Sequence, residues 1–297
     1  MELSDEVLEN LRKAGRAARE ARAYGAGLLR EGLPILEGVE RIEEFLRQRG
    51  CPPAFPTCLS VNHVAAHDTP THKDERVLQR GDVVKIDLGA QIDGYLTDTA
   101  KTVEVGTRNW TEMIRATEAA LAAAIEVVRP KLPTRLVGAA IERTIESFGF
   151  KPVANLTGHS IERFKVHAGK SVPNVADHGD DVLEEGDMIA IEPFATNGAG
   201  KVDGRKSGNI YRIMRVREVR PDSTQRFLKS LDQAFNRLPF AERWAYRLDR
   251  KAPAHLARLV RAGLVYTYPA LYDIAQGIVA QSEHSMIVRS GGAEVLT

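Results

Sequence analysis

The chain has 297 residues, of which 43% are hydrophobic, so it can bury a full core as one large domain or one domain with a modest insertion. Its 41 basic and 40 acidic side chains give a formal charge of +1, which provides no global reason to expect nucleic acid or a membrane surface as a partner. The only cysteines, Cys51 and Cys58, are too few for a disulfide framework and form no Cys-x-x-Cys pair. We interpret them as small hydrophobic residues in a reducing compartment.

Two helices are expected at the start of the chain, the second between Pro34 and Gly50. The first twenty residues lack the apolar stretch of a secretory signal, and no apolar run reaches membrane-spanning length. We therefore expect a cytoplasmic protein with no membrane partner. The first helix should run toward Tyr24, because Ser4 is followed by apolar residues at helical spacing: Val7, Leu8, Leu11, Ala14, Ala18 and Ala21.

A β-hairpin is predicted over residues 82–105, where β-branched runs flank Asp93-Gly94, the strongest short-range hairpin signal. Helical patterns follow over residues 112–128 and 136–147, and a strand-like run covers 187–194. This alternation of strand pairs and helix pairs suggests an α/β (α+β) fold.

Residues 212–262 have a different composition, with thirteen Lys or Arg against five Asp or Glu, a net charge of +8. Three helix-like pieces, separated by Pro239 and Pro253, predict an inserted helical subdomain. Strand-like sequence returns at Tyr268 and runs to Val288. We predict a catalytic domain of residues 1–205 and 266–297, and an insertion of residues 206–265. The positive charge is either a docking surface for ribosomal RNA or, more commonly, a solvated helical face.

Two aspartates occupy opposite arms of the predicted hairpin. If Asp93 and Gly94 form the turn, Gly89 faces Asp98, and Asp87 lies two residues along on the same face. Two carboxylates that point at one spot repel each other unless they are protonated or bridged by a cation, usually a divalent metal. A solvated face is the alternative, and the pair alone does not decide between the two.

Three further residues of metal-ligand type stand in apolar, strand-like frames: His159 in LTGHSI, Glu192 in MIAIEPF and Glu283 in VAQSEHSMIV. Burial of Glu192 in such a frame is strongly unfavourable unless the carboxylate is paired, hydrogen-bonded or metal-bound. Together with the two aspartates, the set is rich in oxygen. It suits two hard or borderline divalent ions better than a single structural zinc.

Two more histidines, His67 and His167, are candidates for proton transfer or oxyanion contact, although a lone histidine in a strand is more often structural. The spacing of His63 and His67 is also that of one helix face. His159 and His167 are separated by an even number of residues, so they would share a face if the stretch between them is extended.

Five phrases carry a family resemblance: FPTCLSVNHVAAHDTP, IDLGAQIDGYLTDTA, LTGHSIERFKVHAGKSVP, IAIEPFAT and YPALYDIAQGIVAQSEHS. In this order, from Phe55 to Val288, they resemble the methionine aminopeptidases. These enzymes belong to the pita-bread metallohydrolases, together with prolidase, aminopeptidase P and creatinase. The helical insertion resembles type II members, and the short N-terminal segment resembles the archaeal form. One departure is a histidine of some type II members, which has no clear counterpart in residues 204–210.

The resemblance implies a pita-bread fold, in which helices flank an antiparallel sheet, and a centre of two divalent ions, for which Co, Mn, Fe and Zn are all suitable. It implies that Asp98 and Glu283 bridge the ions, that Asp87 chelates one, and that His159 and Glu192 complete the other. His67 would stabilise the tetrahedral centre or the substrate amine, and His167 would contact the scissile peptide. The methionine pocket would be lined by Phe55, Val166 and Tyr268.

The implied reaction is removal of the N-terminal methionine from nascent polypeptides with a small second residue, by a metal-bridged water or hydroxide with Glu192 as proton relay. We expect a monomer that acts on peptides and contacts the ribosome transiently. One alternative is a hydrolase of Xaa-Pro bonds that uses the same five ligands. The other is an inactive pita-bread binding protein, which the five intact ligand types disfavour.

Overall fold

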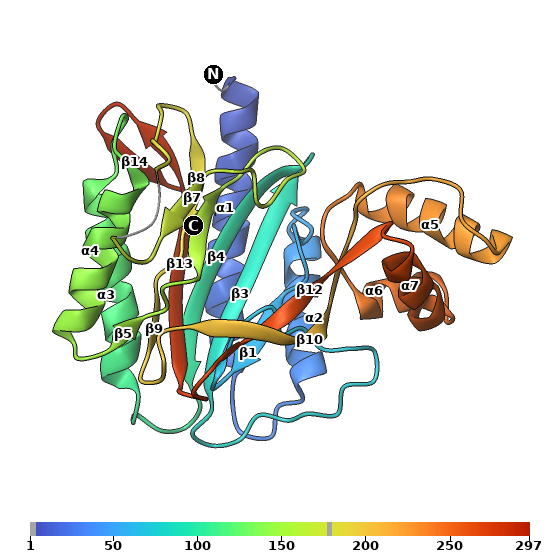
Figure 1. The fold of residues 1–297 in the computed structure, drawn as a ribbon, viewed down its shortest axis with the longest axis horizontal. Coiled ribbons are helices and arrows are strands. Elements are labelled where there is room, and N and C mark those ends of the chain that lie inside the picture. Colours follow the sequence, from blue (N-terminus) through green and yellow to red (C-terminus); the bar gives the residue numbers. More distant parts are fainter. Residues whose placement is uncertain (1–3, 177–179) are drawn as a thin grey trace.

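The computed structural model describes residues 4–176 and 180–297. Figure 1 shows a central sheet backed by two helix pairs and joined to a smaller helical part on one side. The elements are α1 (Asp5–Leu28), α2 (Ile35–Gln48), β1 (Cys58–Val61), β2 (Val64–Ala66), β3 (Val83–Ile92), β4 (Tyr95–Glu104), α3 (Thr111–Val127), α4 (Thr134–Ser147), β5 (Lys151–Pro152), β6 (Thr157–Ser160), β7 (Ser171–Pro173), β8 (Met188–Ile191), β9 (Phe194–Thr196), β10 (Val202–Ile213), α5 (Asp222–Phe235), β11 (Phe240–Ala241), α6 (Glu242–Leu248), α7 (Ala252–Arg261), β12 (Val265–Asp273), β13 (Val279–Arg289) and β14 (Gly292–Val295).

The strands of the described residues form two sheets. The larger, ten-stranded sheet has the central order β1-β3-β4-β13-β8-β6-β7, and β14, β9 and β5 join it at β13 and β9. The smaller, four-stranded sheet has the order β11-β10-β12-β2. All strand pairs in both sheets are antiparallel. The predicted α/β (α+β) fold with an antiparallel sheet flanked by helices is confirmed.

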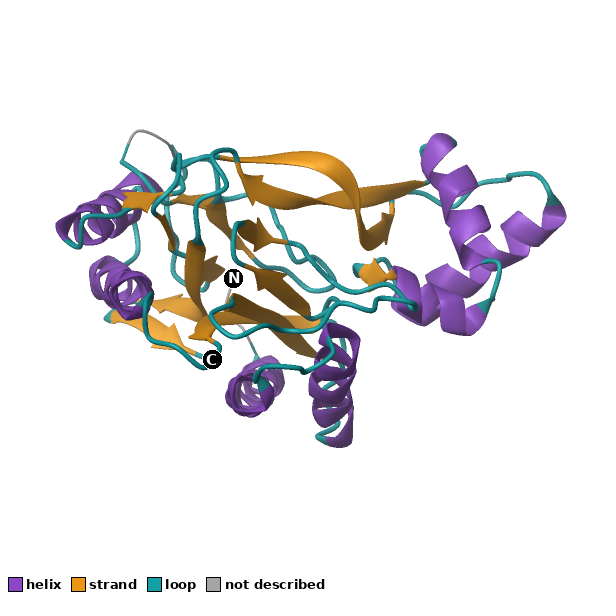
Figure 2. Ribbon diagram, turned by 90° about the horizontal axis from the view of Figure 1, so that it is seen from below, coloured by secondary structure: helices purple, strands orange, loops and turns teal. Residues whose placement is uncertain are grey.

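The four helices of the N-terminal half cover one side of the larger sheet, and the long strands β10 and β12 cross its other side (Figure 2). Helices α1 and α2 pack their apolar side chains on β3 and β4, through residues such as Ile42 and Ile86. Helix α3 packs on β13 and β8, and α4 packs on α3, β7 and β5, within one apolar cluster that includes Ile141 and Met286. Because the helices occupy one side, the other side is left for the cavity described below. Among the described residues, no helix is long and apolar enough to cross a membrane.

The predicted hairpin and N-terminal helices agree with the structure. In the hairpin, Ile92 pairs with Tyr95 and Gly89 pairs with Asp98. Its turn residues, Asp93 and Gly94, have φ angles of 50° and 81°, as a two-residue type I′ turn requires. Ser4 caps the first helix by accepting a 3.4 Å hydrogen bond from the amide of Val7, and this helix continues past Tyr24 to Leu28.

Proline explains two differences from the expected elements. The strand expected over 187–194 is broken after Ile191, because Pro193 has no N–H to donate to a neighbouring strand. Pro253 lies in the first turn of α7 instead of separating two helices, since a helix start does not need that N–H. The run expected from Tyr268 to Val288 consists of two strands, β12 and β13.

The helical part lies between β10 and β12. Its three helices pack around an apolar cluster that includes Phe227, Leu231, Phe240, Leu256 and Leu259. The division of the chain at residues 206 and 265 stays a prediction, because β10 and β12 run through both boundaries.

The hairpin turn provides a test of the fold. A Cβ at Gly94 would lie 2.5 Å from the ring of Phe164, at a φ of 81°. Gly50 has a similar φ, 66°, but open space around the same position. We expect Gly94→Ala to lower the free energy of unfolding more than Gly50→Ala does, by about 1–3 kcal/mol of overpacking. Urea denaturation of both variants measures the difference, and equal losses would mean that the Phe164 contact adds nothing.

Candidate metal centre

A cavity of about 240 Å³ lies between the two sheets. Its lining includes side chains from β3, β4, β6 and β13 of the larger sheet and from β2, β10 and β12 of the smaller one. All ten residues that the sequence singled out for a site line this cavity: Phe55, His67, Asp87, Asp98, His159, Val166, His167, Glu192, Tyr268 and Glu283.

Strand register brings the carboxylates together. Ala100 of β4 pairs with Asp87 of β3 on one side and with Glu283 of β13 on the other. Asp98 lies two residues from Ala100, so its side chain points to the same face of the sheet. Glu192 directly follows β8, the next strand after β13. The four acids therefore come from four adjacent strands and point to one face.

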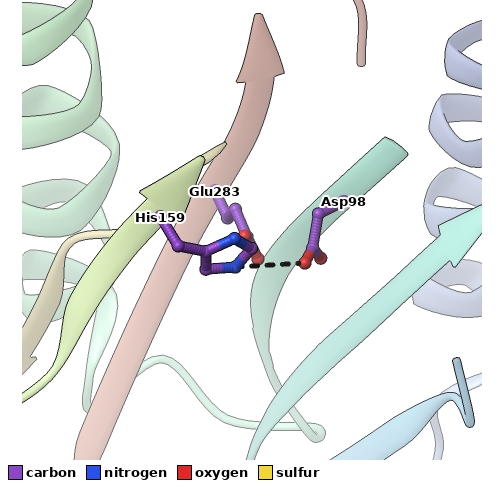
Figure 3. Close-up of side chains that lie close together, drawn as sticks. All are labelled: Asp98, His159 and Glu283. Atoms are coloured by element: carbon purple, nitrogen blue, oxygen red, sulfur yellow. Dashed lines mark ion pairs between the residues drawn. The ribbon is translucent and has the colours of Figure 1, made fainter. Parts of the chain in front are cut away.

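His159 meets the carboxylates from the far side of β8. Its Nε2 lies 3.6 Å from Oδ2 of Asp98 and 3.8 Å from Oε1 of Glu192. Ligand atoms of Asp98, His159 and Glu283 all lie within 4.8 Å of one another (Figure 3). Figure 3 shows the imidazole directed at Asp98, with Glu283 close by on β13. These three buried side chains can hold one metal ion.

The electrostatics of the four acids call for positive charge. Burial raises the pKa of Asp87 to about 7, and burial together with the neighbouring carboxylates raises the pKa values of Asp98, Glu192 and Glu283 well above their ordinary range. Burial lowers the pKa of His159 to about 4, which leaves a neutral imidazole with a free lone pair. A divalent cation would stabilise all four carboxylates and accept that lone pair.

Unpartnered oxygen atoms provide an independent test of the fit. Within the part of the chain that the structure describes, Oδ1 of Asp87 and Oδ1 of Asp98 are buried and accept no hydrogen bond. Buried polar atoms are almost always satisfied, so two unsatisfied carboxylate oxygens in one cavity require an explanation. Coordination of divalent ions by this oxygen-rich set provides it.

The histidines reach the cavity by routes that the sequence did not show. β6 ends at Ser160, and the chain then turns through Phe164, whose φ is 58°. His159 and His167 are therefore not on one strand, yet their ring centroids are 4.4 Å apart. His67 follows β2 and belongs to no helix, so the helix-face alternative for His63 and His67 is wrong.

Both predicted catalytic histidines are uncharged. Burial lowers the pKa of His67, and burial with the neighbouring His159 and His67 lowers the pKa of His167 to about 2. The Nδ1 atom of His67 lies 3.2 Å from the carbonyl oxygen of Pro269. The His67 ring meets that of Tyr268 edge-on at 5.7 Å. A neutral imidazole can donate at one nitrogen and accept at the other, which suits recognition of a peptide group.

One residue that contacts the buried carboxylates was not predicted from the sequence. Gln281 is fully buried, and its Nε2 lies 3.4 Å from Oε2 of Glu192 and 3.4 Å from Oε2 of Glu283. A hydrogen bond from Gln281 partly offsets the rise that burial causes in the pKa of Asp87. The available signal was its position two residues before Glu283 on one strand, which places both on the same face. Residues that line the cavity and that we did not predict include Cys58, Asn155, Phe194, Ile210 and Pro239.

Comparison with known proteins establishes the family. Residues 9–220 match metallopeptidase family M24. The chain belongs to this family. It is 43% identical over 296 residues to a methionine aminopeptidase of Archaeoglobus fulgidus, covering 99% of this chain and 100% of that protein.

Solved structures agree on the fold. A methionine aminopeptidase from Thermotoga maritima matches with a TM-score of 0.72 at 24% identity, covering 99% of this chain and 98% of that one. A thermophilic Arx1 matches with a TM-score of 0.86 at 19% identity, covering 99% and 91%. The predicted pita-bread fold is confirmed. Family membership and the cluster of Asp98, His159 and Glu283 together indicate divalent metal ions and a peptide substrate.

Gln281 provides a test of how the carboxylates are held. Gln281→Met keeps the size of the side chain but removes the donor that orients Glu192 and Glu283. We expect metal affinity to fall by about 10–100-fold, as is usual when an outer partner of a metal ligand is lost. Titration calorimetry with Mn²⁺ or Co²⁺ measures this, with Gln48→Met on the exposed face of α2 as the control. Equal affinities in both variants would show that Gln281 orients neither ligand.

Proposed function

We propose that the protein removes the N-terminal methionine from newly made polypeptides with a small second residue. One observation carries the proposal: the residues expected to bind metal, the methionine side chain and the scissile peptide all line a single cavity. The full-length similarity to proteins named methionine aminopeptidase agrees with it.

We assign two divalent ions to the site. Asp98 and Glu283 would contact both, Asp87 would hold one, and His159 with Glu192 would complete the other. Bound ions of this kind polarise a carbonyl group and lower the pKa of water. Their identity among Co, Mn, Fe and Zn depends on availability, since all four suit this set of donors.

The protein's own side chains divide the remaining work. The methionine side chain would lie against an apolar wall formed by three residues that line the cavity: Phe55, Val166 and Tyr268. The neutral His167 hydrogen-bonds the scissile peptide. The neutral His67 donates from Nδ1 to the carbonyl of Pro269, so its Nε2 accepts a hydrogen bond from the substrate amine.

Glu192 moves the proton from the attacking water to the leaving amine. Its side chain is 15% exposed, compared with 7% for Asp98, so it is the more accessible of these two acids. A carboxylate that must exchange protons with substrate needs this access.

Hydrolysis of Met-Ala-Ser tests the activity directly. We expect the metal-stripped protein to release methionine only after titration with Co, Mn or Fe. Asp98→Asn should lower kcat/KM by more than about a hundredfold, because even loss of an outer partner of a metal ligand can have that effect. Asp93→Asn, in the exposed turn of the same hairpin, is the matched control.

The same assay separates the alternatives. Preference for an Xaa-Pro peptide over Met-Ala-Ser would identify an Xaa-Pro hydrolase, which the 43% identical relative does not favour. If folded protein releases no amino acid from either peptide in the presence of metal, the inactive pita-bread binding protein becomes the remaining explanation. The five intact, cavity-lining ligand candidates argue against that outcome.

We also propose that the protein acts as a cytoplasmic monomer and that its basic helical part contacts ribosomal RNA transiently. The structure narrows the residues available for this contact. Arg243 is buried against Glu43, and Arg247 pairs with Glu40. Exposed basic residues remain on the surface of the helical part: Arg215, Arg217, Arg220, Arg226, Lys229, Arg237, Arg250, Lys251, Arg258 and Arg261.

Charge reversal tests this contact. The variant Arg250→Glu/Lys251→Glu/Arg258→Glu/Arg261→Glu should co-sediment with ribosomes less than the native chain does. The slope of log affinity against log salt should fall by about one for each lost phosphate contact. Lys13→Glu/Arg16→Glu on the exposed face of α1 is the control. Unchanged co-sedimentation would identify the charge as a solvated face.

A further inference from the structure

A buried ion pair joins the helical part to the catalytic half. Glu43 of α2 and Arg243 of α6 are in contact, and each side chain is only 1% exposed. Oε2 of Glu43 also accepts a 2.8 Å hydrogen bond from the indole of Trp244. Two charges are removed from water here, which is unfavourable unless each is fully paired. Oε2 of Glu43 also lies 3.4 Å from Nη2 of Arg47, whereas Nε of Arg243 has no hydrogen-bond partner among the described residues.

The pair also holds backbone next to the cavity. The amide of Thr57 donates to Oε1 of Glu43 over 3.2 Å, and its carbonyl accepts from the hydroxyl of Thr69 over 2.8 Å. Nη1 of Arg243 donates to that same hydroxyl over 2.7 Å and to the carbonyl of Pro70 over 3.2 Å. Both backbone groups of Thr57, and the segment that contains Thr69, are thus fixed by the two charged side chains.

The fixed segments carry one wall of the cavity. Phe55 lies two residues before Thr57, and His67 lies two residues before Thr69. Ile210 and Pro239 also line this wall. Ile210 lies on β10, which leads into the helical part, and Pro239 lies within that part, just before β11. The side chain of Asn209 donates to the carbonyl of Thr69 over 3.0 Å, so β10 is joined to the same segment.

The metal-ligand candidates are held by the register of the larger sheet, in which Cys58, next to Thr57, pairs with Asp87. They lie on β3, β4, β6 and β13 and directly after β8. In the described residues, their side chains make no hydrogen bond to Glu43, Thr57, Thr69 or Arg243. A change at the ion pair can therefore displace the apolar wall and leave the metal centre in place.

We propose that Glu43 and Arg243 are positioning residues that set the wall of the methionine pocket against the metal centre, and so determine selectivity for the first side chain. The proposal rests on the aminopeptidase function proposed above. A purely structural anchor for the helical part would instead affect stability, without a selective change in substrate binding.

The chain contains a matched control. Arg247 and Glu40 form a second ion pair between α6 and α2, 2.5 Å apart, but their side chains are 53% and 41% exposed. This pair links the same two helices without contact to the cavity wall. Exposed pairs of this kind contribute little to stability. Arg243→Met and Arg247→Met each remove an ion pair between α6 and α2. Only the first of these pairs is bonded to the segments that carry the cavity wall.

The experiment compares these variants, with Glu43→Gln and Arg243→Lys, on Met-Ala-Ser and Leu-Ala-Ser. For Arg243→Met and Glu43→Gln we expect KM for Met-Ala-Ser to rise and the Met/Leu ratio of kcat/KM to fall about tenfold, the scale of fit in an apolar pocket. Arg243→Lys, which keeps the charge, should recover part of the ratio. Arg247→Met should match the native protein, and metal affinity should be unchanged throughout.

Two results would overturn the proposal: an unchanged Met/Leu ratio in both wall variants, or a fall in kcat together with metal affinity. Glu43→Gln preserves volume and provides the same test if Arg243→Met does not fold.

If the native protein releases no methionine, the proposed function fails, and hydrogen exchange of the amides of Thr57 to Leu59 still tests positioning. Exchange there should be faster in Glu43→Gln than in Arg247→Met, and equal rates would reject the proposal.

Discussion

The repulsion among four buried carboxyl groups is the constraint on which the rest of the structure depends. Burial raises the pKa values of Asp87, Asp98, Glu192 and Glu283 together, and the neighbours reinforce one another. No apolar core would tolerate this set for the sake of stability alone. The arrangement is suited to binding divalent cations, because their positive charge offsets the repulsion among the carboxylates and attracts each of them.

The register of the sheet holds the four carboxylates in place. Antiparallel pairing fixes the acids of β3, β4 and β13 against one another, and a slip of one residue would turn each to the opposite face. β8 and β6 must then approach closely enough to add Glu192 and His159. Gly158 permits this, because a Cβ at that position would overlap the carbonyl group of Ala190 on β8. Helices α1 to α4 bury the other face and make the register rigid.

The parts that could be predicted from the sequence have a local signal. The Asp93-Gly94 turn determines the pairing of Gly89 with Asp98, and the two-residue period of strands then relates Asp87 to Asp98. His159, Glu192 and Glu283 were recognised as ligand types in apolar frames, whereas Phe55, Val166 and Tyr268 were recognised only through the family resemblance. Gln281 was missed because a neutral amide in an apolar strand carries no metal-ligand signal. The approach of His167 to His159 depends on a turn with a positive φ at Phe164, a residue type that rarely adopts one.

The Glu43–Arg243 pair shows why long-range organisation escaped prediction. In its own window each residue looks like an ordinary charge on a helix, and Arg243 even counted toward the basic surface. Only the fold reveals that the two, 200 residues apart, are buried against each other. Their burial also separates two tasks. The sheet positions the carboxylates through backbone register, while side-chain bonds between distant segments position the pocket wall. Because different interactions hold the reacting centre and the wall, substitutions in the helical part can alter which side chain is accepted without disturbing the metal ligands.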